Sequence, residues 1–459
     1  MAEAVRTLII LGAGGDLTSR LLLPALGQLL THDEGRRVTL IGAGSQDWTR
    51  QHWRHQVRES FDTVKATGPA VVDLLASTRY VTADVTKPDE LRRLLGEAEG
   101  TPALYFALPP AVTKQVVKAL AGLELPAGIR LALEKPFGTD RRSAAALNRM
   151  LAALVPENQV HRIDHFLGNS TVQNLFGLRF ANRIFEPLWS AAHIDRVDIV
   201  FDEQLGLEGR AGYYDHAGAL VDMIQSHLLQ VLAVAAMEPP STMRANDLRD
   251  AKGLVLRATR VWDDDAVANS HRGRYTKGRI GGRILPSYVD EEGVDPKLNT
   301  ETLAQVTFAI DNWRWAGVPF TLRSGKAIGA QRHEIVLTFK QAQHVPTGLR
   351  GVAQPTRLRI TIGPDEAVLE LNTNGPGDPR YLSRAEMHAE FGPGSLLAYG
   401  EVLSDLFDGD PALSVRGDTA EECWRIIAPV LKAWGDGRVP LDDYSAGSDG
   451  PAEWPVIPR

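Results

Sequence analysis

The feature that most constrains the fold is an apolar run that leads through a glycine-rich turn into a helical segment. Residues 7–11 read Thr-Leu-Ile-Ile-Leu, residues 12–17 read Gly-Ala-Gly-Gly-Asp-Leu, and residues 21–30 form the helical segment. Glycines let a backbone approach an anion closely, and the following helix N-terminus presents free N–H groups and a positive dipole end. The turn therefore predicts pyrophosphate binding, although its G-x-G-G spacing departs from G-x-G-x-x-G and such turns also arise for geometric reasons alone. The residues expected at the nucleotide are Gly12, Ala13, Gly14, Gly15, Asp16 and Leu17.

Strands alternate with helices along the first third of the chain. Further apolar runs lie at residues 37–41, 103–107 and 129–133, and each ends in a turn that contains glycine or proline. Such alternation is typical of a parallel sheet flanked by helices, with the ligand crevice at the carboxyl ends of the strands. We expect this α/β domain to span residues 1–160.

The pattern changes after about residue 160. Long alternating segments follow one another closely, at residues 194–202, 302–310 and 333–339. Alternation of this kind indicates strands of an antiparallel sheet. We therefore expect residues 161–459 to form an α+β domain with a large, mainly antiparallel sheet.

Composition excludes several classes of protein. With 459 residues, 44% hydrophobic and 23% charged, the chain is predicted to be a folded, water-soluble protein of two or three domains. A net charge of -7 offers no general attraction for phosphate backbones, so no nucleic-acid partner is expected. A single cysteine, Cys423, favours a reducing cytoplasm and no cysteine-based metal site. No secretion signal is expected, because residues 1–6 lead directly into a strand-like segment without a basic start, an apolar stretch and a cleavage site. No membrane segment is expected, because the densest apolar stretch, residues 21–30, is much shorter than the ~20 residues that span a bilayer.

The end of the second predicted strand bears on the choice between the two dinucleotides. A carboxylate there would bind the ribose diol, whereas an arginine would accommodate a 2′-phosphate. The chain has Gly-Ser-Gln-Asp at residues 44–47, so Ser45 suits either cofactor. Arg20 and Arg50 are candidate phosphate partners, with surface solvation as the alternative role for each. NADP and NAD both stay open.

Two short segments contain candidate groups for proton transfer. Residues 162–166 place Asp164 beside His165, and residues 222–227 place Asp222 and His227 on an amphipathic helical stretch. A histidine accepts a hydroxyl proton near neutral pH, and a neighbouring carboxylate fixes its tautomer and stabilises its charged form. Structural, hydrogen-bonded histidines are the alternative interpretation.

Several blocks in a fixed order resemble the glucose-6-phosphate dehydrogenase family. The glycine turn, Glu-Lys-Pro-Phe-Gly at 134–138 and Arg-Ile-Asp-His-Phe-Leu-Gly at 162–168 are similar to its signatures. Further blocks that resemble the family lie at residues 173–175, 178–182, 299–302, 311–320 and 323–326. The resemblance implies a Rossmann-like dinucleotide-binding domain followed by the α+β domain.

The resemblance also implies residue roles. His227 would remove the C1 hydroxyl proton while Asp164 bonds the other imidazole nitrogen, and the hydride would pass from C1 to the nicotinamide. Lys135 would lie between cofactor and sugar. Leu108, Pro109 and Pro136 would shape the nicotinamide pocket, and His165, Asn169, Glu203, Asp222 and Lys326 would bind the sugar or its phosphate.

Four positions in three segments depart from the family pattern. The family usually reads His-Tyr-Leu-Gly-Lys where this chain has Phe166 and Asn169, which removes a hydroxyl and an ammonium normally credited with holding the sugar phosphate. Ser45 stands where an arginine for the 2′-phosphate is usual. Gly14 replaces a serine or threonine of the glycine turn.

Together these features predict a cytoplasmic oxidoreductase of carbohydrate metabolism and the pentose phosphate pathway. It would oxidise C1 of glucose 6-phosphate, or of a related sugar, to the 6-phosphogluconolactone with NADP or NAD. One alternative is a diverged dehydrogenase for an unphosphorylated or differently substituted hexose. Another is a non-catalytic sugar-binding or regulatory paralogue, against which the presence of Asp164, His227 and Lys135 argues. A homodimer or homotetramer is expected, because a large antiparallel sheet suits a dimer interface.

Overall fold

The computed structural model describes residues 4–375, 377–392 and 394–457. The chain divides into two compact units, and neither is continuous in sequence. Unit 1 comprises Met1–Asn169, Pro240–Gly253 and Gly394–Glu422, and unit 2 comprises Ser170–Pro239, Leu254–Pro393 and Cys423–Arg459. The outer ends of the predicted domains, at residues 1–3 and 458–459, lie outside the described residues.

Unit 1 is built on a seven-stranded sheet in the order β18-β6-β5-β4-β1-β2-β3. Strands β1 to β6 are parallel, and β18 is antiparallel to β6. Central strand β1 is rich in β-branched residues. It is buried along almost its whole length, which is typical of a strand that is covered on both faces. The strands are β1 (Val5–Leu11), β2 (Thr39–Gly44), β3 (Arg79–Thr82), β4 (Thr101–Phe106), β5 (Arg130–Glu134), β6 (Val160–Ile163) and β18 (Ser414–Val415).

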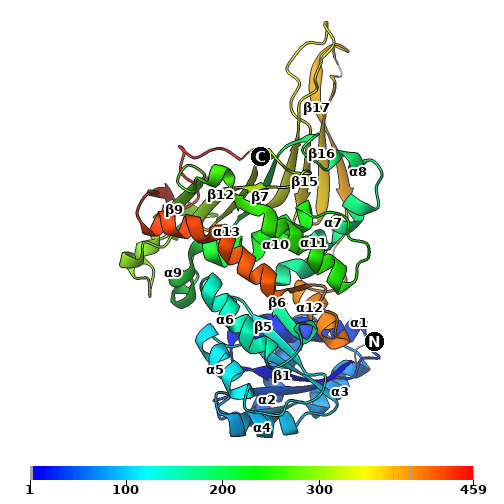
Figure 1. Cartoon of the computed structure of the whole chain (residues 1–459), viewed down its shortest axis with the longest axis vertical. Helices are drawn as coiled ribbons and strands as arrows, with labels where there is room; N and C mark the ends of the chain where they lie inside the picture. The colour runs from blue at the N-terminus through cyan, green and yellow to red at the C-terminus, as the bar shows by residue number, and fades with distance from the viewer. Residues whose placement is uncertain (1–3, 376, 393, 458–459) are drawn as a thin grey trace. The chain divides into compact units, whose positions relative to one another are not determined.

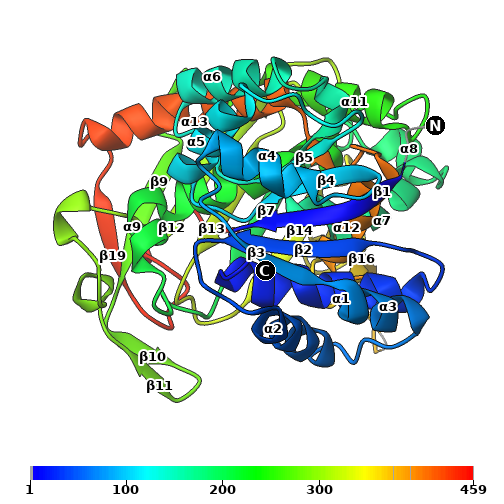
Figure 2. The same cartoon turned by 90° about the horizontal axis from the view of Figure 1, so that it is seen from below.

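Helices cover both faces of this sheet. Figure 2 shows α1, α2 and α3 on one face and α4, α5 and α6 on the other. α12 packs beside α1 and contributes Leu403, Leu406 and Phe407 to the same apolar core. The helices are η1 (Thr18–Leu22), α1 (Leu23–His32), α2 (Arg50–Asp62), α3 (Pro69–Ser77), α4 (Pro88–Gly96), α5 (Pro110–Leu120), α6 (Arg141–Ala152), η2 (Glu157–Gln159), η3 (His165–Gly168) and α12 (Ala398–Asp408).

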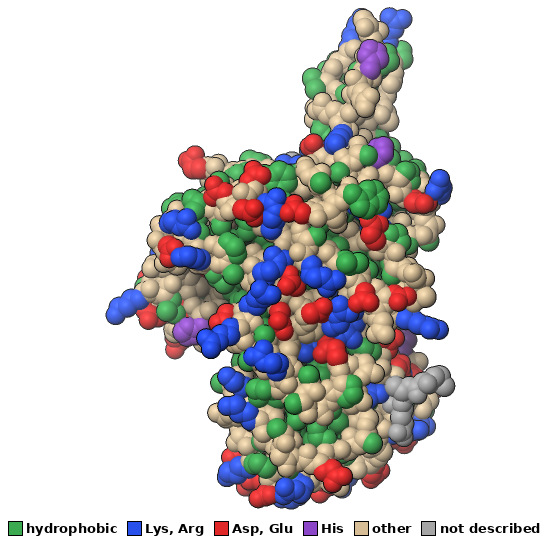
Figure 3. Space-filling view, in the orientation of Figure 1, with side chains coloured by type: hydrophobic (Ala, Val, Ile, Leu, Met, Phe, Trp, Pro, Cys, Tyr) green, Lys and Arg blue, Asp and Glu red, His purple; other side chains and the backbone are tan. Residues whose placement is uncertain are grey.

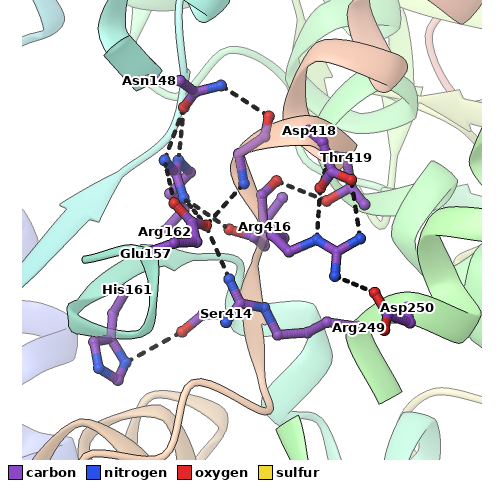
Figure 4. Close-up of polar contacts among 12 residues, drawn as sticks. Asn148, Glu157, His161, Arg162, Arg249, Asp250, Ser414, Arg416, Asp418 and Thr419 are labelled. Atoms are coloured by element: carbon purple, nitrogen blue, oxygen red, sulfur yellow. Dashed lines mark hydrogen bonds and ion pairs between the residues drawn. The ribbon is translucent and has the colours of Figure 1, made fainter. Parts of the chain in front are cut away.

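One carboxylate joins the three separate stretches of unit 1 (Figure 4). Glu157 accepts hydrogen bonds from the Arg162 guanidinium at 2.7 Å, the Arg249 guanidinium at 2.9 Å and the Gly417 N–H at 3.0 Å. Asn148 adds a bond to the Gly417 carbonyl at 2.8 Å. The Arg162 side chain is fully buried, so its charge depends on these partners.

Unit 2 is built on a ten-stranded sheet in the order β17-β16-β15-β14-β7-β13-β12-β9-β19, with β8 beside β12. Most neighbouring strands are antiparallel, and the parallel pairs are β7 with β13 and β9 with β19. Figure 1 shows β16 and β17 extending beyond the rest of the sheet. The strands are β7 (Ile194–Asp202), β8 (Thr259–Val261), β9 (Ser270–Thr276), β12 (Leu303–Ile310), β13 (Phe320–Gly325), β14 (Arg332–Phe339), β15 (Arg357–Thr361), β16 (Glu366–Asn374), β17 (Leu382–Glu390) and β19 (Leu441–Ser445); β10 (Gly278–Ile280) and β11 (Arg283–Leu285) form a separate hairpin.

The helices of unit 2 pack on this sheet and on one another. α10 contacts α7, and η4 packs on β12 and β13. The helices are α7 (Ser170–Phe180), α8 (Phe185–Leu188), α9 (Ala211–Ala219), η4 (Leu220–Leu228), α10 (Leu229–Ala236), η5 (Trp262–Asp264), η6 (Tyr288–Asp290) and η7 (Pro296–Leu298). Two further helices, α11 (Ala245–Ala258) and α13 (Gly417–Gly435), each contain residues of both units. The predicted fold class, a parallel α/β sheet and a large, mainly antiparallel sheet, is confirmed.

One helical stretch among the described residues is long and apolar enough by composition to cross a membrane. It runs through α9, η4 and α10 from Ala211 to Ala236, and 83% of its most apolar window is buried inside the protein. Burial of this extent is typical of a core helix of a soluble protein.

On the face drawn in Figure 3, acidic and basic side chains are interspersed.

Candidate active site

The glycine turn follows β1 directly, and its first residue packs closely against the segment after β4. Gly12 has a φ of +82°, and a Cβ there would lie 2.3 Å from the Ala107 carbonyl oxygen. The N–H groups of Gly12 and Ala13 donate to the Ala43 carbonyl at 2.8 and 3.1 Å, which fixes the turn beside β2. Gly15 and Asp16 are exposed where the helical segment begins. The turn therefore fits the pyrophosphate of a dinucleotide.

The residues after β2 lie over this turn. Ser45 and Gln46 are exposed, and a Cβ on Gly14 would lie 2.6 Å from the Gln46 amide nitrogen. Tyr80 donates to the Gln46 amide oxygen at 3.0 Å, which orients the side chain. The absence of a side chain at Gly14 thus leaves space for Gln46. Sequence reasoning did not assign Gln46 a role, although it lies in the Gly-Ser-Gln-Asp segment considered there.

The two candidate arginines have different surroundings. The Arg50 guanidinium donates to the Ala76 carbonyl at 2.8 Å and the Thr78 carbonyl at 3.3 Å. Arg20 is highly exposed, and its Nε lies 3.9 Å from the Asp16 carboxylate. The Arg50 guanidinium therefore hydrogen-bonds the backbone where α3 leads into β3.

The carboxyl ends of β4, β5 and β6 bring further predicted residues to the same edge of the sheet as the glycine turn. Phe106 pairs with Leu11 and Leu133, and Glu134 pairs with Ile163. Because the strands are parallel and end together, the residues that follow them line one edge. These residues are Gly12, Ser45, Leu108, Pro109, Lys135, Pro136 and Asp164.

Asp164 and His165 begin η3. Asp164 is 2% exposed, and its carboxylate accepts a hydrogen bond from the Phe166 N–H at 3.0 Å. The His165 ring stacks on the Tyr399 ring, with centroids 5.0 Å apart and an angle of 18° between the planes. Asn169 follows η3, and its N–H donates to the Phe166 carbonyl at 3.1 Å. The Phe166 side chain is buried.

Glu134 is a second residue that sequence reasoning missed. It ends β5 immediately before Lys135, and its carboxylate accepts a hydrogen bond from the Tyr105 hydroxyl. Burial raises the pKa of Glu134 to about 7, against the lowering effects of Tyr105, Lys135 and Tyr399. A carboxylate directly after the apolar residues 131–133 of the strand was the available signal.

Asp222 and His227 lie on the π-helical segment η4 of unit 2. They are five residues apart, and π-helical i→i+5 bonding places positions five apart one turn above the other. The His227 side chain is buried, at 2% exposed. The two predicted residues therefore share one face of η4.

Glu301 fixes the start of η4. Its carboxylate accepts the Leu220 N–H at 3.0 Å, and its carbonyl accepts the Ala219 N–H at 3.2 Å. Gly218 has a φ of +66°, and a Cβ there would lie 2.2 Å from the Glu301 carboxylate. Burial raises the pKa of Glu301 to about 7. Sequence reasoning quoted Glu301 only as part of a family block.

Glu203 and Lys326 form an ion pair in unit 2. They follow β7 and β13, whose ends pair in register at Asp202 and Gly325. The Lys326 ammonium lies 2.7 Å from the Glu203 carboxylate and 5.1 Å from the Tyr214 ring centroid. The parallel pairing of the two strands thus brings two predicted substrate residues together. Among the residues that the structure describes, no group of three or more His, Cys, Asp or Glu side chains is placed to hold a metal ion.

Comparison with known proteins assigns both parts of the sequence to one family. A model described as "Glucose-6-phosphate dehydrogenase, NAD binding domain" matches residues 9–174, and one described as "Glucose-6-phosphate dehydrogenase, C-terminal domain" matches residues 176–457. The chain belongs to the glucose-6-phosphate dehydrogenase family. The predicted family, the oxidoreductase class and the NAD(P)-binding domain are confirmed.

Relatives match this family member along their whole length. Glucose-6-phosphate 1-dehydrogenase of Zymomonas mobilis is 38% identical, and the match covers 98% of this chain and 97% of that protein. The crystal structure of the Mycobacterium avium enzyme is 33% identical with a TM-score of 0.84, covering 97% and 96% of the two chains. A glucose-6-phosphate dehydrogenase in complex with its substrate glucose-6-phosphate is 29% identical with a TM-score of 0.87, covering 99% and 97%.

Proposed function

We propose that this chain oxidises C1 of glucose 6-phosphate to 6-phosphogluconolactone and reduces NADP or NAD. The observation that carries the proposal is the match over 98% of the chain to an enzyme named glucose-6-phosphate 1-dehydrogenase. The presence of Asp164, His227 and Lys135 supports a catalytic protein over a non-catalytic paralogue.

The proposed reaction separates a proton from a hydride. His227 takes the proton of the C1 hydroxyl, and the C–O bond becomes the lactone carbonyl as the hydride leaves C1. A bound nicotinamide supplies the hydride acceptor. Asp164 stabilises the imidazolium that forms and fixes the tautomer of the neutral ring. The burial of both side chains supports these roles, because charge interactions are stronger away from water.

The cofactor residues are proposed from the carboxyl edge of the unit 1 sheet. The turn from Gly12 to Leu17 would hold the pyrophosphate, and Ser45 would face the adenosine ribose. Leu108, Pro109 and Pro136 would border the nicotinamide, with Lys135 between cofactor and sugar. Contact between Gly12 and Leu108 supports a continuous surface, since a Cβ on Gly12 would lie 2.8 Å from Leu108.

The proposed substrate residues are those that the family resemblance assigns. Glu203, Asp222 and Lys326 would bind sugar hydroxyls or the phosphate region, and the pairing of Lys326 with Glu203 at 2.7 Å keeps both groups ordered. His165 and Asn169 would face the sugar phosphate. Because Asn169 carries no charge, we propose weak phosphate binding.

A sugar and cofactor panel tests this function. Purified enzyme is assayed with glucose 6-phosphate, glucose and other hexose phosphates, each with NADP and with NAD. Oxidation of glucose 6-phosphate is expected, with a high KM because the phosphate is weakly bound. A kcat/KM for an unphosphorylated hexose that exceeds the value for glucose 6-phosphate would favour the diverged sugar dehydrogenase, and no oxidation of any sugar would favour the non-catalytic paralogue.

Domain limits and assembly complete the proposal. We propose a nucleotide-binding domain at 1–160 and a substrate-binding domain at 161–459; the two family models, which match residues 9–174 and 176–457, support a division into two domains. We propose a cytoplasmic homodimer or homotetramer that uses the large sheet of unit 2. Light scattering coupled to size exclusion tests it, and a monomer at micromolar concentration would contradict it.

A further inference from the structure

The backbone of Lys326 is held from two sides. Its N–H donates to the Thr302 carbonyl at 2.8 Å, and its carbonyl accepts a hydrogen bond from the Tyr444 hydroxyl at 2.7 Å. The hydroxyl groups of Tyr444 and Thr302 lie 2.8 Å apart, which joins the two supports. Only the flexible four-carbon stem of Lys326 is therefore left to decide where its ammonium lies.

The face of the Tyr214 ring is a second neighbour of the Lys326 ammonium, besides Glu203. The ammonium nitrogen lies 5.1 Å from the ring centroid and 2.7 Å from the Glu203 carboxylate. The negative face of an aromatic ring attracts a cation that lies over it within about 6 Å of the centroid, and the attraction is stronger away from water. Lys326 is 5% exposed and Tyr214 is 3% exposed. The contact is therefore shielded from water.

The Tyr214 ring is itself fixed by its neighbours. Tyr214 lies on α9 and belongs to a buried cluster that also contains Leu207, Tyr275 and Tyr288. The Tyr288 ring meets it edge to face, with centroids 6.4 Å apart and an angle of 67° between the planes. The Glu203 side chain is 24% exposed, so its carboxylate alone restrains the ammonium less. The ring is therefore the more rigid of the two partners of Lys326.

A lysine ammonium has three N–H donors. Glu203 accepts one of them, and the face of Tyr214 occupies a second direction. We propose that Tyr214 is a positioning residue for Lys326, because its ring and the Glu203 carboxylate together leave the ammonium one direction in which to donate, toward an oxygen of the bound sugar. The inference rests on the proposed function, since Lys326 is taken there as a substrate contact.

Removal of the ring tests the inference through KM. Tyr214→Leu is expected to raise the KM for glucose 6-phosphate by about three- to thirty-fold, the range that a cation–π contact supplies, and to leave kcat nearly unchanged. Tyr214→Phe keeps the ring face and should keep the KM of the wild type. Tyr288→Leu is the matched control, because it removes another buried ring from the same cluster. An unchanged KM in Tyr214→Leu, or an equal rise in Tyr288→Leu, would overturn the inference.

Fluorinated forms of Tyr214→Phe separate the charge of the ring from its size. Each added fluorine weakens the negative face of the ring with little change in volume. The KM for glucose 6-phosphate should therefore rise stepwise through the mono-, di- and trifluorinated forms, with circular dichroism showing the same fold. A KM that stays constant along the series would contradict the inference, because a ring that only fills space does not respond to its charge.

A double-mutant cycle tests whether Tyr214 acts through Lys326. The ammonium is absent in Lys326→Met, so adding Tyr214→Leu to this variant should have no further effect on KM. Additive effects would show a separate role for Tyr214 and would overturn the inference.

A magnetic resonance measurement provides a readout that needs no turnover. In enzyme that is isotope-labelled at lysine Cε, the Lys326 proton–carbon signal is identified by its loss in Lys326→Met. The ring current above an aromatic face shifts such a signal upfield, so Tyr214→Leu is expected to move it downfield, while Tyr214→Phe leaves it near its place. An unmoved signal in Tyr214→Leu would overturn the inference. A wild type that oxidises no sugar would instead overturn the proposed function, and the signal would still decide whether the Tyr214 ring holds Lys326.

Discussion

Lys326 and Glu203, which are 123 residues apart in the chain, meet at 2.7 Å because two parallel strands end in register. The ammonium side chain is 7% exposed and the carboxylate side chain 24% exposed, so the pair is largely shielded from water. Removing one member leaves the other with a poorly compensated charge.

Lys326→Met is expected to lower the free energy of unfolding by about 1 to 3 kcal/mol, less than for a fully buried pair because Glu203 keeps some exposure. The double variant Lys326→Met with Glu203→Leu should recover part of the loss. Urea unfolding of the two single variants and the double variant checks the coupling. Additive losses would show that the two side chains do not stabilise each other.

His227→Ala is expected to lower kcat by about 10²-fold or more, because a general base contributes about 10² to 10⁴. Asp164→Asn should cause a smaller loss by setting the wrong tautomer. Steady-state kinetics on folded protein, with circular dichroism as the control, checks both. Near-normal turnover in His227→Ala would remove this residue as the base.

The wild type is expected to discriminate weakly between NADP and NAD, because Ser45 offers no charge to a 2′-phosphate. Ser45→Arg should shift the ratio of kcat/KM values toward NADP by about ten-fold or more through a charge-assisted bond. Gln46→Ala is the matched control at the neighbouring exposed position. A hundred-fold preference of the wild type for NADP would show that another cation, such as Arg20, binds the phosphate.

Phe166→Tyr combined with Asn169→Lys is expected to lower the KM for glucose 6-phosphate by about ten-fold or more, since it restores a hydroxyl and a charged donor. The KM for unphosphorylated glucose should stay unchanged or rise, because the lysine would then lack a partner. Tight wild-type binding that the double change leaves unaltered would mean that other groups bind the phosphate.

The raised pKa of Glu301 predicts that the free energy of unfolding depends on pH. Its pKa is raised to about 7 in the folded state, so the folded protein holds a proton that the unfolded chain releases from about pH 4.5 upward. The free energy of unfolding therefore falls as pH rises between these values, by at most about 3 kcal/mol from this group. Glu301→Gln should remove that part of the fall. Urea unfolding at several pH values checks it, and parallel curves for the two proteins would contradict it.

Sequence reasoning predicted those features that depend on neighbours in the chain. The turn at Gly12 follows its strand directly, and the alternating segment 194–202 coincides with β7. The contact between Glu203 and Lys326 was not predictable, because it depends on which strands pair and in what register. The same is true of Glu134, whose hydrogen-bond partner Tyr105 lies on the neighbouring strand β4.

The pairing of β18 with β6 has a consequence for synthesis of the protein. Because Gly394–Glu422 supplies an edge strand and α12 to unit 1, the first 169 residues leave Leu403, Leu406 and Phe407 missing from their core when they emerge from the ribosome. The nucleotide-binding unit is then incomplete until almost the whole chain has been translated. A gene fragment that ends at residue 169 would encode a sheet without β18. This unit therefore cannot be transferred to another protein as one continuous segment.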